Sequence, residues 1–297
     1  MEIRYLGEIM ALVAALGMAG GSISFEVAGK KVGSLTVNIV RLIQGMIFLS
    51  ITSLYMRGLP LPTDASLKEY TFLGISGFIG MFLGDLFMFE SFVLLGARIT
   101  TLIMTTVPVV TALTAWILLG ETLSFQEGIA VLLTIGGIFL VMFYGNGKGE
   151  KKEKFPIKGI LCAIGGVLGQ SLGMVFSKIG LESYDPIAAT QIRIIVATIA
   201  FIILISMRGK WGEVKEGMKD KKALKWLVVG SFFGPFIGVT AMLIALKNAS
   251  AGIVSTLSST SPILVIPFCI LIFKERVKPV EILGAVISVG GASLFFI

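Results

Sequence analysis

Ten apolar runs of about 20 residues each restrict what this 297-residue chain can fold into. A helix of about 20 residues rises roughly 30 Å, the thickness of the hydrocarbon core of a bilayer. The runs lie near residues 6–28, 35–56, 70–93, 98–119, 124–144, 157–179, 186–207, 223–246, 250–273 and 279–297. They are too long for barrel strands and do not alternate, so we expect an all-α polytopic membrane protein with ten transmembrane helices.

Composition excludes the other broad classes. Hydrophobic residues make up 55% of the chain and charged residues 14%, against about 25% charged residues in an ordinary soluble domain. The net charge of +7 comes mostly from residues between the apolar runs, so it indicates topology and predicts no nucleic-acid partner. The chain has no histidine, which excludes histidine metal sites, histidine proton relays and Ser-His-Asp catalysis. We expect no cofactor.

The two halves of the chain repeat one another. A shift of about 152–154 residues superposes landmarks in the same order: Gly17 on Gly169, Gly21 on Gly173, Arg41 on Arg193, Gly80 on Gly234, Gly84 on Gly238, Pro108 on Pro262 and Glu121 on Glu275. We expect a first repeat at 1–146, a basic linker at 147–156 and a second repeat at 157–297. Five helices per repeat is an odd number, so the second repeat must be inverted relative to the first. Inverted repeats are common in secondary transporters.

Two segments carry a resemblance to a known family. They are PVVTALTAWILLGETLSFQEGIAVLLTIGGIFLV from Pro108 and PILVIPFCILIFKERVKPVEILGAVISVGGASLFF from Pro262. Both resemble the EamA domain of the drug/metabolite transporter superfamily, and an arginine in the second helix of each repeat, Arg41 or Arg193, is also similar to that family. The resemblance covers essentially the whole chain, although Gly-Glu at 120–121 becomes Lys-Glu at 274–275. It implies a ten-helix transporter of small metabolites, often an exporter.

The distribution of lysine and arginine predicts the orientation in a cell membrane. Eighteen lysine and arginine residues lie in or beside the connections that follow the odd-numbered runs, and five lie on the opposite side. The positive-inside rule places the first set in the cytoplasm and both termini outside. Members of the family are often drawn with both termini inside, so the orientation stays open. The sequence also leaves a monomer and a homodimer open.

Charged residues inside the apolar runs are the first candidates for function, because burying them in a membrane is unfavourable. Arg41 lies roughly 9 Å into the second run, and Asp85 lies roughly 12 Å from the end of the third run, measured from the same membrane face. An Arg41–Asp85 ion pair is therefore compatible with their depths. The pair is either static or rearranges when substrate binds.

The repeat equivalent of Arg41 is Arg193, but Val239 stands at the position that matches Asp85. If Arg193 faces a cavity, its guanidinium suits a substrate carboxylate or phosphate. The alternative, slightly favoured by the sequence, is that Arg193 reaches the interface and pairs with Asp185 or Glu182.

Two further carboxylates, Glu26 and Glu90, lie near helix ends on one face. We expect them to be interfacial and solvated. The alternative is that they line a vestibule or, like Asp85, carry a coupling proton.

Uncharged polar residues within the runs are further candidates for a cavity wall: Gln44, Thr105, Gln170, Gln191, Thr240, Ser258 and Ser259. Hydroxyl groups also bond to carbonyls of their own helix, which is the structural alternative. Four small-residue pairs predict close helix packing: Gly17/Gly21, Gly80/Gly84, Gly169/Gly173 and Gly234/Gly238.

The leading functional prediction is a secondary transporter of a small polar metabolite, such as an amino acid, through a cavity between the repeats. The alternative is a proton-coupled exporter of organic cations, in which carboxylates dominate the site. A membrane-embedded enzyme or sensor is disfavoured, because the sequence has no HExxH motif and Asp85 lacks the first glycine of a GxGD motif. A Walker A motif is also missing from the sequence.

Overall fold

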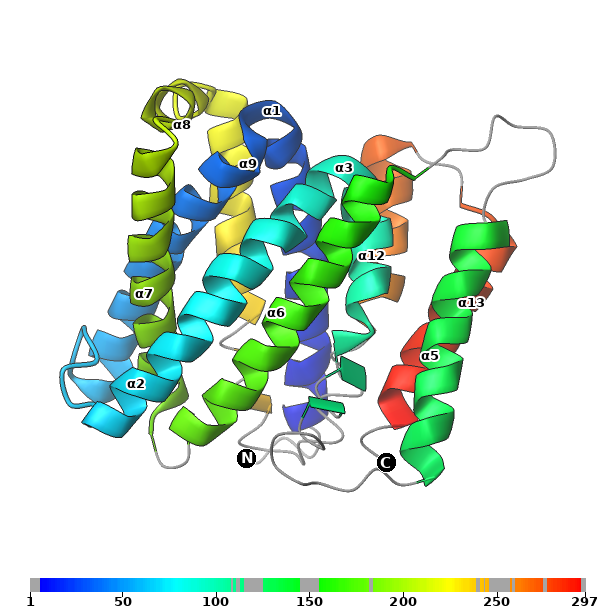
Figure 1. The fold of residues 1–297 in the computed structure, drawn as a ribbon, viewed down its shortest axis with the longest axis horizontal. Coiled ribbons are helices and arrows are strands. Elements are labelled where there is room, and N and C mark those ends of the chain that lie inside the picture. The colour runs from blue at the N-terminus through cyan, green and yellow to red at the C-terminus, as the bar shows by residue number, and fades with distance from the viewer. Residues whose placement is uncertain are drawn as a thin grey trace.

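The computed structural model describes residues 6–107, 109–110, 113–114, 125–144, 155–181, 184–238, 241–242, 244–245, 257, 260–274 and 277–294. Every regular element within these ranges is a helix, and the described part of the chain holds no strand (Figure 1). The prediction of an all-α fold is confirmed. In Figure 1 the short helix α8 lies at the upper edge, while α1 begins and α13 ends at the lower edge.

Apart from the short polar helix α8, the described helices lie along predicted apolar runs, and parts of the runs 98–119, 223–246 and 250–273 lie outside the described residues. The first half contains α1 (Leu6–Arg57), α2 (Leu67–Ser76), the π-helical η1 (Gly77–Gly84), α3 (Asp85–Met104) and α5 (Phe125–Tyr144). The second half contains α6 (Ile157–Leu181), α7 (Pro186–Met207), α8 (Trp211–Gly217), α9 (Lys221–Ser231), the π-helical η2 (Phe232–Gly238), α12 (Ser261–Phe268), the π-helical η3 (Cys269–Phe273) and α13 (Pro279–Ser293).

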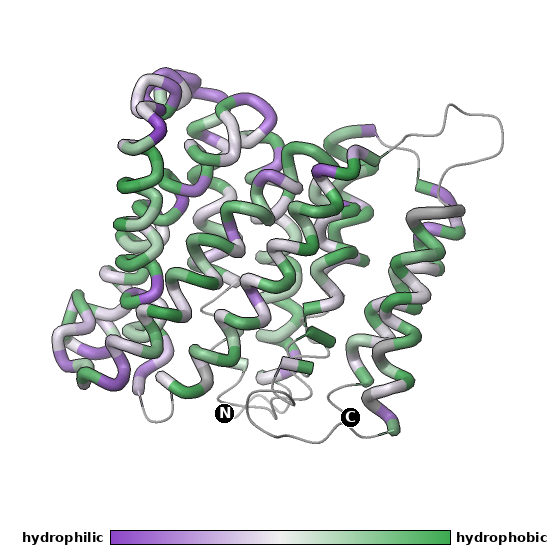
Figure 2. The backbone as a smooth tube through the Cα atoms, viewed as in Figure 1, coloured by the Kyte–Doolittle hydropathy of each residue, from purple (hydrophilic) through white to green (hydrophobic). Residues whose placement is uncertain are grey.

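Several of these helices have the length and composition of membrane spans. Within the described residues, four stretches qualify: Leu6–Arg57, Leu67–Met104, Ile157–Ser177 and Pro186–Met207. Three more apolar helices are shorter, at Gly128–Val141, Ser261–Phe273 and Pro279–Ser293. Figure 2 shows hydrophobic residues along most of the helices and hydrophilic residues gathered around α8 and around the loop that follows α1. These features fit a membrane protein, while ten crossings remain a prediction.

Glycines divide the two longest stretches where the sequence predicts turns. Gly33 in α1 has φ 79° and ψ 157°, and Gly96 in α3 has φ 81° and ψ 165°. This backbone conformation is accessible to glycine but strained for residues with a Cβ. Each break therefore separates two helical arms, and the arms of α1 correspond to the predicted runs 6–28 and 35–56.

The first close helix crossing joins the first arm of α1 to η2. A Cβ placed on Gly17 would lie 2.6 Å from the carbonyl oxygen of Phe233 and 3.2 Å from Cα of Gly238. A Cβ on Gly21 would lie 2.9 Å from Cα of Gly234. Real Cβ atoms do not approach other atoms this closely, so the crossing requires glycine on α1.

The second crossing is the repeat equivalent of the first and joins α6 to η1. A Cβ on Gly173 would lie 2.7 Å from Cα of Gly80, and one on Gly84 would lie 3.1 Å from the backbone nitrogen of Gln170. Gly169 contacts the backbone of Gly84 directly. In both crossings the first helix of one repeat packs on the π-helical part of the third helix of the other.

The last helices of the repeats, α5 and α13, also pack through glycine. A Cβ on Gly137 would lie 2.5 Å from the carbonyl oxygen of Gly284, and a Cβ on Gly291 would lie 2.5 Å from the backbone nitrogen of Thr134. The preceding residues, Gly136 and Gly290, have no atom within 4 Å of the same position. The two Gly-Gly pairs thus place one glycine in the interface and one outside it.

This arrangement predicts opposite effects for neighbouring substitutions. Gly137→Ala should destabilise the protein by about 1–3 kcal/mol, because the new methyl group overpacks the α5–α13 interface. Gly136→Ala is the matched control and should be neutral or stabilising by about 0.5–1 kcal/mol, because alanine is the better helix former. Thermal unfolding in detergent measures both. Equal melting temperatures for the two variants would show that α5 and α13 do not pack in this way.

Candidate functional site

The predicted ion pair between Arg41 and Asp85 is present. Arg41 lies on the second arm of α1, and Asp85 is the first residue of α3, directly after η1. Their exposed fractions are 9% and 3%. Asn38, one turn before Arg41, accepts hydrogen bonds from Nε and Nη2 of Arg41, each at 3.2 Å. The pairing and the amide together offset the unfavourable burial of both charges.

A third helix completes the environment of the carboxylate. Nε2 of Gln170, on α6, donates to Oδ1 of Asp85 at 2.6 Å, while Arg41 engages Oδ2. Nδ2 of Asn38 donates to the backbone oxygen of Ser34 at 3.2 Å and lies 3.4 Å from the backbone oxygen of Asp85. Both carboxylate oxygens are therefore occupied by donors from α1 and α6.

Arg193, on α7, lies near the same carboxylate, with no direct ion pair to it among the described residues. Its Nη2 lies 3.4 Å from the position of a Cβ on Gly80, and its backbone packs against Gly77. The charges of Arg193 and Asp85 attract each other. The buried Nε of Arg193 has no hydrogen-bond partner among the described residues. The slightly favoured prediction of a pair with Asp185 is wrong, because Asp185 pairs with Arg57, and Glu182 lies outside the described residues.

The site therefore contains two guanidinium groups and one carboxylate. We call Arg41, Asp85, Gln170 and Arg193 the charged cluster. Its described ionisable groups carry an excess of one positive charge. Because the surroundings are apolar, this excess acts more strongly than it would in water.

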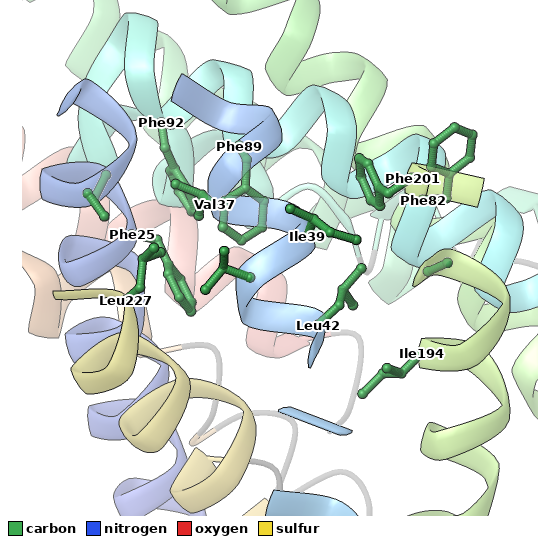
Figure 3. Close-up of a cluster of buried hydrophobic side chains, with 14 of the residues drawn as sticks. Phe25, Val37, Ile39, Leu42, Phe82, Phe89, Phe92, Ile194, Phe201 and Leu227 are labelled. Atoms are coloured by element: carbon green, nitrogen blue, oxygen red, sulfur yellow. The ribbon is translucent and has the colours of Figure 1, made fainter. Parts of the chain in front are cut away.

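Aromatic side chains enclose the cluster on the α3 side. The guanidinium carbon of Arg41 lies 4.3 Å from the ring centroid of Phe89, a geometry that stabilises a cation. Phe89 is buried, and its ring contacts Phe25 and Phe92 at centroid distances of 5.3 and 5.4 Å. Figure 3 shows Phe89 and Phe92 next to Val37 within this core. The core excludes water from one side of Arg41.

Glu90 lies on a different surface from the charged cluster. Its Oε2 accepts a hydrogen bond from Ser34 at 2.7 Å, and its Oε1 pairs with Lys158 at 2.9 Å. Glu90 borders a cavity of about 430 Å³, together with Phe87 and residues of the α7–α8 connection. The position of Glu90 thus agrees with the alternative in which this carboxylate lines a vestibule.

Glu26 does not share that cavity, and the expectation that it is solvated is wrong. Only 1% of Glu26 is exposed. Its Oε2 accepts the backbone N–H of Ala97 at 2.5 Å, and its Oε1 pairs with Lys30. Ala97 begins the helical arm after the break at Gly96, so Glu26 caps the N-terminus of that arm.

The remaining predicted polar residues connect helices at other places. Gln44 accepts a hydrogen bond from Ser231 at 2.7 Å, and Thr105 contacts Ser288 at 2.7 Å. Gln191 donates to the backbone oxygen of Pro60 at 2.8 Å. None of these three contacts belongs to the charged cluster. Thr240, Ser258 and Ser259 lie outside the described residues.

Three residues that support Arg41 or join helices are absent from the predicted set: Asn38, Arg98 and Glu281. Asn38 supports Arg41 from three residues away, and the i, i+3 spacing on one helix is a signal that could have identified it. Arg98 pairs with Glu281 at 2.8 Å, which joins the second arm of α3 to α13. These two charges lie in different repeats, so no local spacing predicts their contact.

A second network ties the two repeats together at the lower edge of Figure 1. Nη2 of Arg57, at the end of α1, pairs with Asp64 at 2.6 Å, and its Nε pairs with Asp185 at 3.4 Å. The hydroxyl of Tyr184 donates to Asp64 at 2.9 Å. We call these four residues the lower-edge network.

The lower-edge network predicts that the stability of the fold depends on pH in the acidic range. The hydrogen bonds from Arg57 and then Tyr184 hold the pKa of Asp64 below its ordinary value of 3.8. A lowered pKa in the folded state stabilises the fold above about pH 4, and the effect is lost as the pH falls below that value. Asp64→Asn should lower the melting temperature at pH 7 by at most about 3 °C, and the difference should narrow below about pH 4. Glu216→Gln, on exposed α8, is the control. A difference that persists unchanged at acid pH would contradict the role of Asp64.

Comparison with known proteins gives one family. The model of the EamA-like transporter family matches residues 5–143 and again residues 157–297. An uncharacterized transporter of Archaeoglobus fulgidus is 25% identical over 91% of this chain and 90% of its own length. The uncharacterized transporter YetK of Bacillus subtilis is 22% identical over 97% of this chain and 86% of its own length.

Two further matches have either a shorter overlap or a lower sequence identity. Solute carrier family 35 member G1 of Homo sapiens is 26% identical over 57% of this chain and 46% of its own length. A solved crystal structure superposes with a TM-score of 0.64, covering 98% of this chain and 96% of that chain at 15% identity. At that identity the superposition supports the fold alone.

Proposed function

Because the chain belongs to the EamA-like transporter family, we propose that it is a secondary transporter of a small metabolite with a carboxylate or similar anionic group, such as an amino acid. Transport proceeds by alternating access between the inverted repeats, most simply in the export direction. The substrate's anionic group binds the charged cluster. The proposal includes no catalytic step, cofactor or nucleic acid.

The observation that carries this proposal is the excess positive charge of the cluster. Arg41 is neutralised by Asp85, whereas the described surroundings of Arg193 provide only a share of the same carboxylate. Arg193 also has a buried Nε without a described acceptor. A substrate carboxylate supplies both the missing charge and the missing acceptor, in the bidentate geometry that a guanidinium prefers.

The same contacts argue against the organic-cation alternative. A cationic substrate requires a carboxylate that is available to it. Asp85 already accepts hydrogen bonds from Arg41 and Gln170, and a second guanidinium lies nearby. An added cation would compete with these donors and meet repulsion from both arginines.

The packing of the helices supports the alternating-access part of the proposal. The crossing of α1 with η2 and the crossing of α6 with η1 are related by exchange of the repeats. Two equivalent arrangements of similar energy are what alternating access requires. The proposed architecture keeps ten membrane-spanning helices, with repeats at 1–146 and 157–297 joined by the basic linker 147–156.

The proposed location is the cell membrane, with the lysine- and arginine-rich side in the cytoplasm. Asp85, Glu90 and Glu26 stay as coupling candidates, of which Glu90 is the one that borders a cavity. One chain supplies both repeats, so the transport unit is a monomer or a homodimer of complete units.

Reconstitution into liposomes tests the proposal. Liposomes loaded with labelled amino acids or carboxylates should lose them faster when they contain the protein, and organic cations should not follow the same route. Empty liposomes and liposomes with the Arg193→Met variant are the controls. Movement of organic cations alone would overturn the proposal in favour of the alternative.

A further inference from the structure

The cavity beside Glu90 lies at the same edge of the molecule as α8. Its wall is formed by the Gly33 break of α1, by α3, by the start of α6 and by the α7–α8 connection. Three cations line it, Lys158, Arg208 and Lys210, and two carboxylates, Glu90 and Glu213. Its volume of about 430 Å³ lies in the range of small-molecule sites.

The charges around this cavity do not balance. Lys158 pairs with Glu90 at 2.9 Å, and Lys210 pairs with Glu213 at 3.0 Å. Arg208 has no ion pair among the described residues. The cavity therefore has an excess of one positive charge on a rim that is open to solvent. Apolar side chains of Leu86, Phe87 and Val93, among others, complete the wall.

A continuous series of contacts connects this cavity to the charged cluster. Ser34 donates to Glu90 at 2.7 Å, and the backbone oxygen of Ser34 accepts from Asn38 at 3.2 Å. Asn38 in turn accepts from Arg41, which pairs with Asp85. Ser34, Asn38 and Arg41 follow one another on a single helical arm. Hydrogen bonds along this one helical arm therefore join the wall of the cavity to the residue that holds Arg41.

We propose that this cavity is a second binding site for the transported anion, an entrance site on the side of the membrane that carries α8. The anionic group is attracted by Arg208 and competes with Glu90 for Lys158, and the apolar wall accommodates the rest of the molecule. The assignment to the transported anion rests on the proposed function. The attraction of small soluble anions to the cavity is independent of it.

A thiol in the wall allows a test without a known substrate. Cys162 lines the cavity, and Cys269 is buried in the hydrophobic core, so peptide mass spectrometry separates their reactions. The purified protein is treated with the anionic reagent 2-sulfonatoethyl methanethiosulfonate or the cationic reagent 2-(trimethylammonium)ethyl methanethiosulfonate. The measured quantity is the ratio of the anionic to the cationic labelling rate at Cys162.

The proposal predicts that the double variant Arg208→Gln, Lys210→Gln lowers this ratio at least about fivefold at low salt, and less at high salt. The matched control is Lys215→Gln with Lys219→Gln, which removes two lysines of the α8 region that do not line the cavity. If Cys162 is too slow to label, Val93→Cys provides a second thiol in the wall. An unchanged ratio in the cavity variant would overturn the proposal, and so would inertness of both thiols.

A lipid head group is the other source of an anion at this edge. Labelling is therefore compared in nanodiscs of phosphatidylcholine with and without phosphatidylglycerol. Protection of Cys162 that requires phosphatidylglycerol would assign the cavity to lipid and overturn the entrance site. Protection by a soluble carboxylate such as glutamate in phosphatidylcholine alone supports it. Because labelling requires no transport, the labelling result can be interpreted even if the liposome assay shows no transport. Failure of the entrance site and failure of the proposed function are therefore distinguishable.

Discussion

Replacing Arg193 with methionine should reduce transport of an anionic substrate by at least about 30-fold, while the melting temperature stays equal or rises. A charge-assisted contact in a buried site contributes about 2–5 kcal/mol to binding, which corresponds to that loss of affinity. The stability prediction has a different cause. The Nε of Arg193 is buried and has no described acceptor, so replacing the guanidinium relieves its desolvation.

The combination of lost transport and preserved stability separates a binding role from a structural one. A structural arginine would lower the melting temperature when it is removed. Transport is measured in liposomes and stability in detergent, with Lys215→Met on exposed α8 as the matched change of cation to methionine. Normal transport by the Arg193→Met variant would exclude Arg193 from the substrate site.

Replacing Arg41 alone should have the largest effect on stability. Arg41→Ala leaves the buried carboxylate of Asp85 with Gln170 and the more distant charge of Arg193. Breaking one partner of a buried ion pair costs about 3–5 kcal/mol. Equilibrium unfolding of the purified protein measures this loss.

The double variant Arg41→Gln, Asp85→Asn should recover most of the stability that Arg41→Gln alone loses. It removes both charges and keeps groups that can hydrogen-bond with Asn38 and Gln170. The difference between the double change and the sum of the single changes gives the coupling between the two residues. A coupling near zero would show that the pair does not hold the cluster together.

Much of the fold follows from local patterns in the sequence. Apolar run length predicts the helices, and the repeat places Gly17 and Gly21 in positions equivalent to Gly169 and Gly173. Depth along the helices also brings Arg41 level with Asp85, and the structure contains that pair. Depth is a one-dimensional property, however, and it leaves the rotation of each helix undetermined.

The position of Arg193 illustrates this limit. Its repeat equivalent, Arg41, pairs with Asp85, whereas Val239 stands at the position where Arg193 would need the matching acid. The sequence slightly favours an interfacial position for Arg193, with Asp185 or Glu182 as its partner. The packing of α7 on η1 instead places Arg193 close enough to Asp85, the carboxylate that pairs with Arg41, for their charges to attract. Two repeat-related arginines share an acid that exists in only one repeat, and this follows from tertiary packing.

Glu26 shows a second limit. Its role as a cap depends on the break at Gly96 and on the approach of Ala97, 71 residues later in the chain. Hydropathy places a carboxylate near a helix end, but it does not reveal which N–H group donates a hydrogen bond to that carboxylate. The π-helical stretches η1 and η2 escape prediction for a related reason, since helical periodicity does not distinguish a widened turn.

Ligand-dependent stabilisation of the purified protein tests most directly whether the charged cluster binds an anionic group. A ligand that binds the folded state raises its melting temperature by mass action. Amino acids and organic anions are compared with organic cations, for the parent protein and for Arg193→Met. We expect at least one anion or zwitterion to raise the melting temperature of the parent protein and to leave that of Arg193→Met unchanged. Stabilisation by organic cations alone, lost in Asp85→Asn and retained in Arg193→Met, would contradict it.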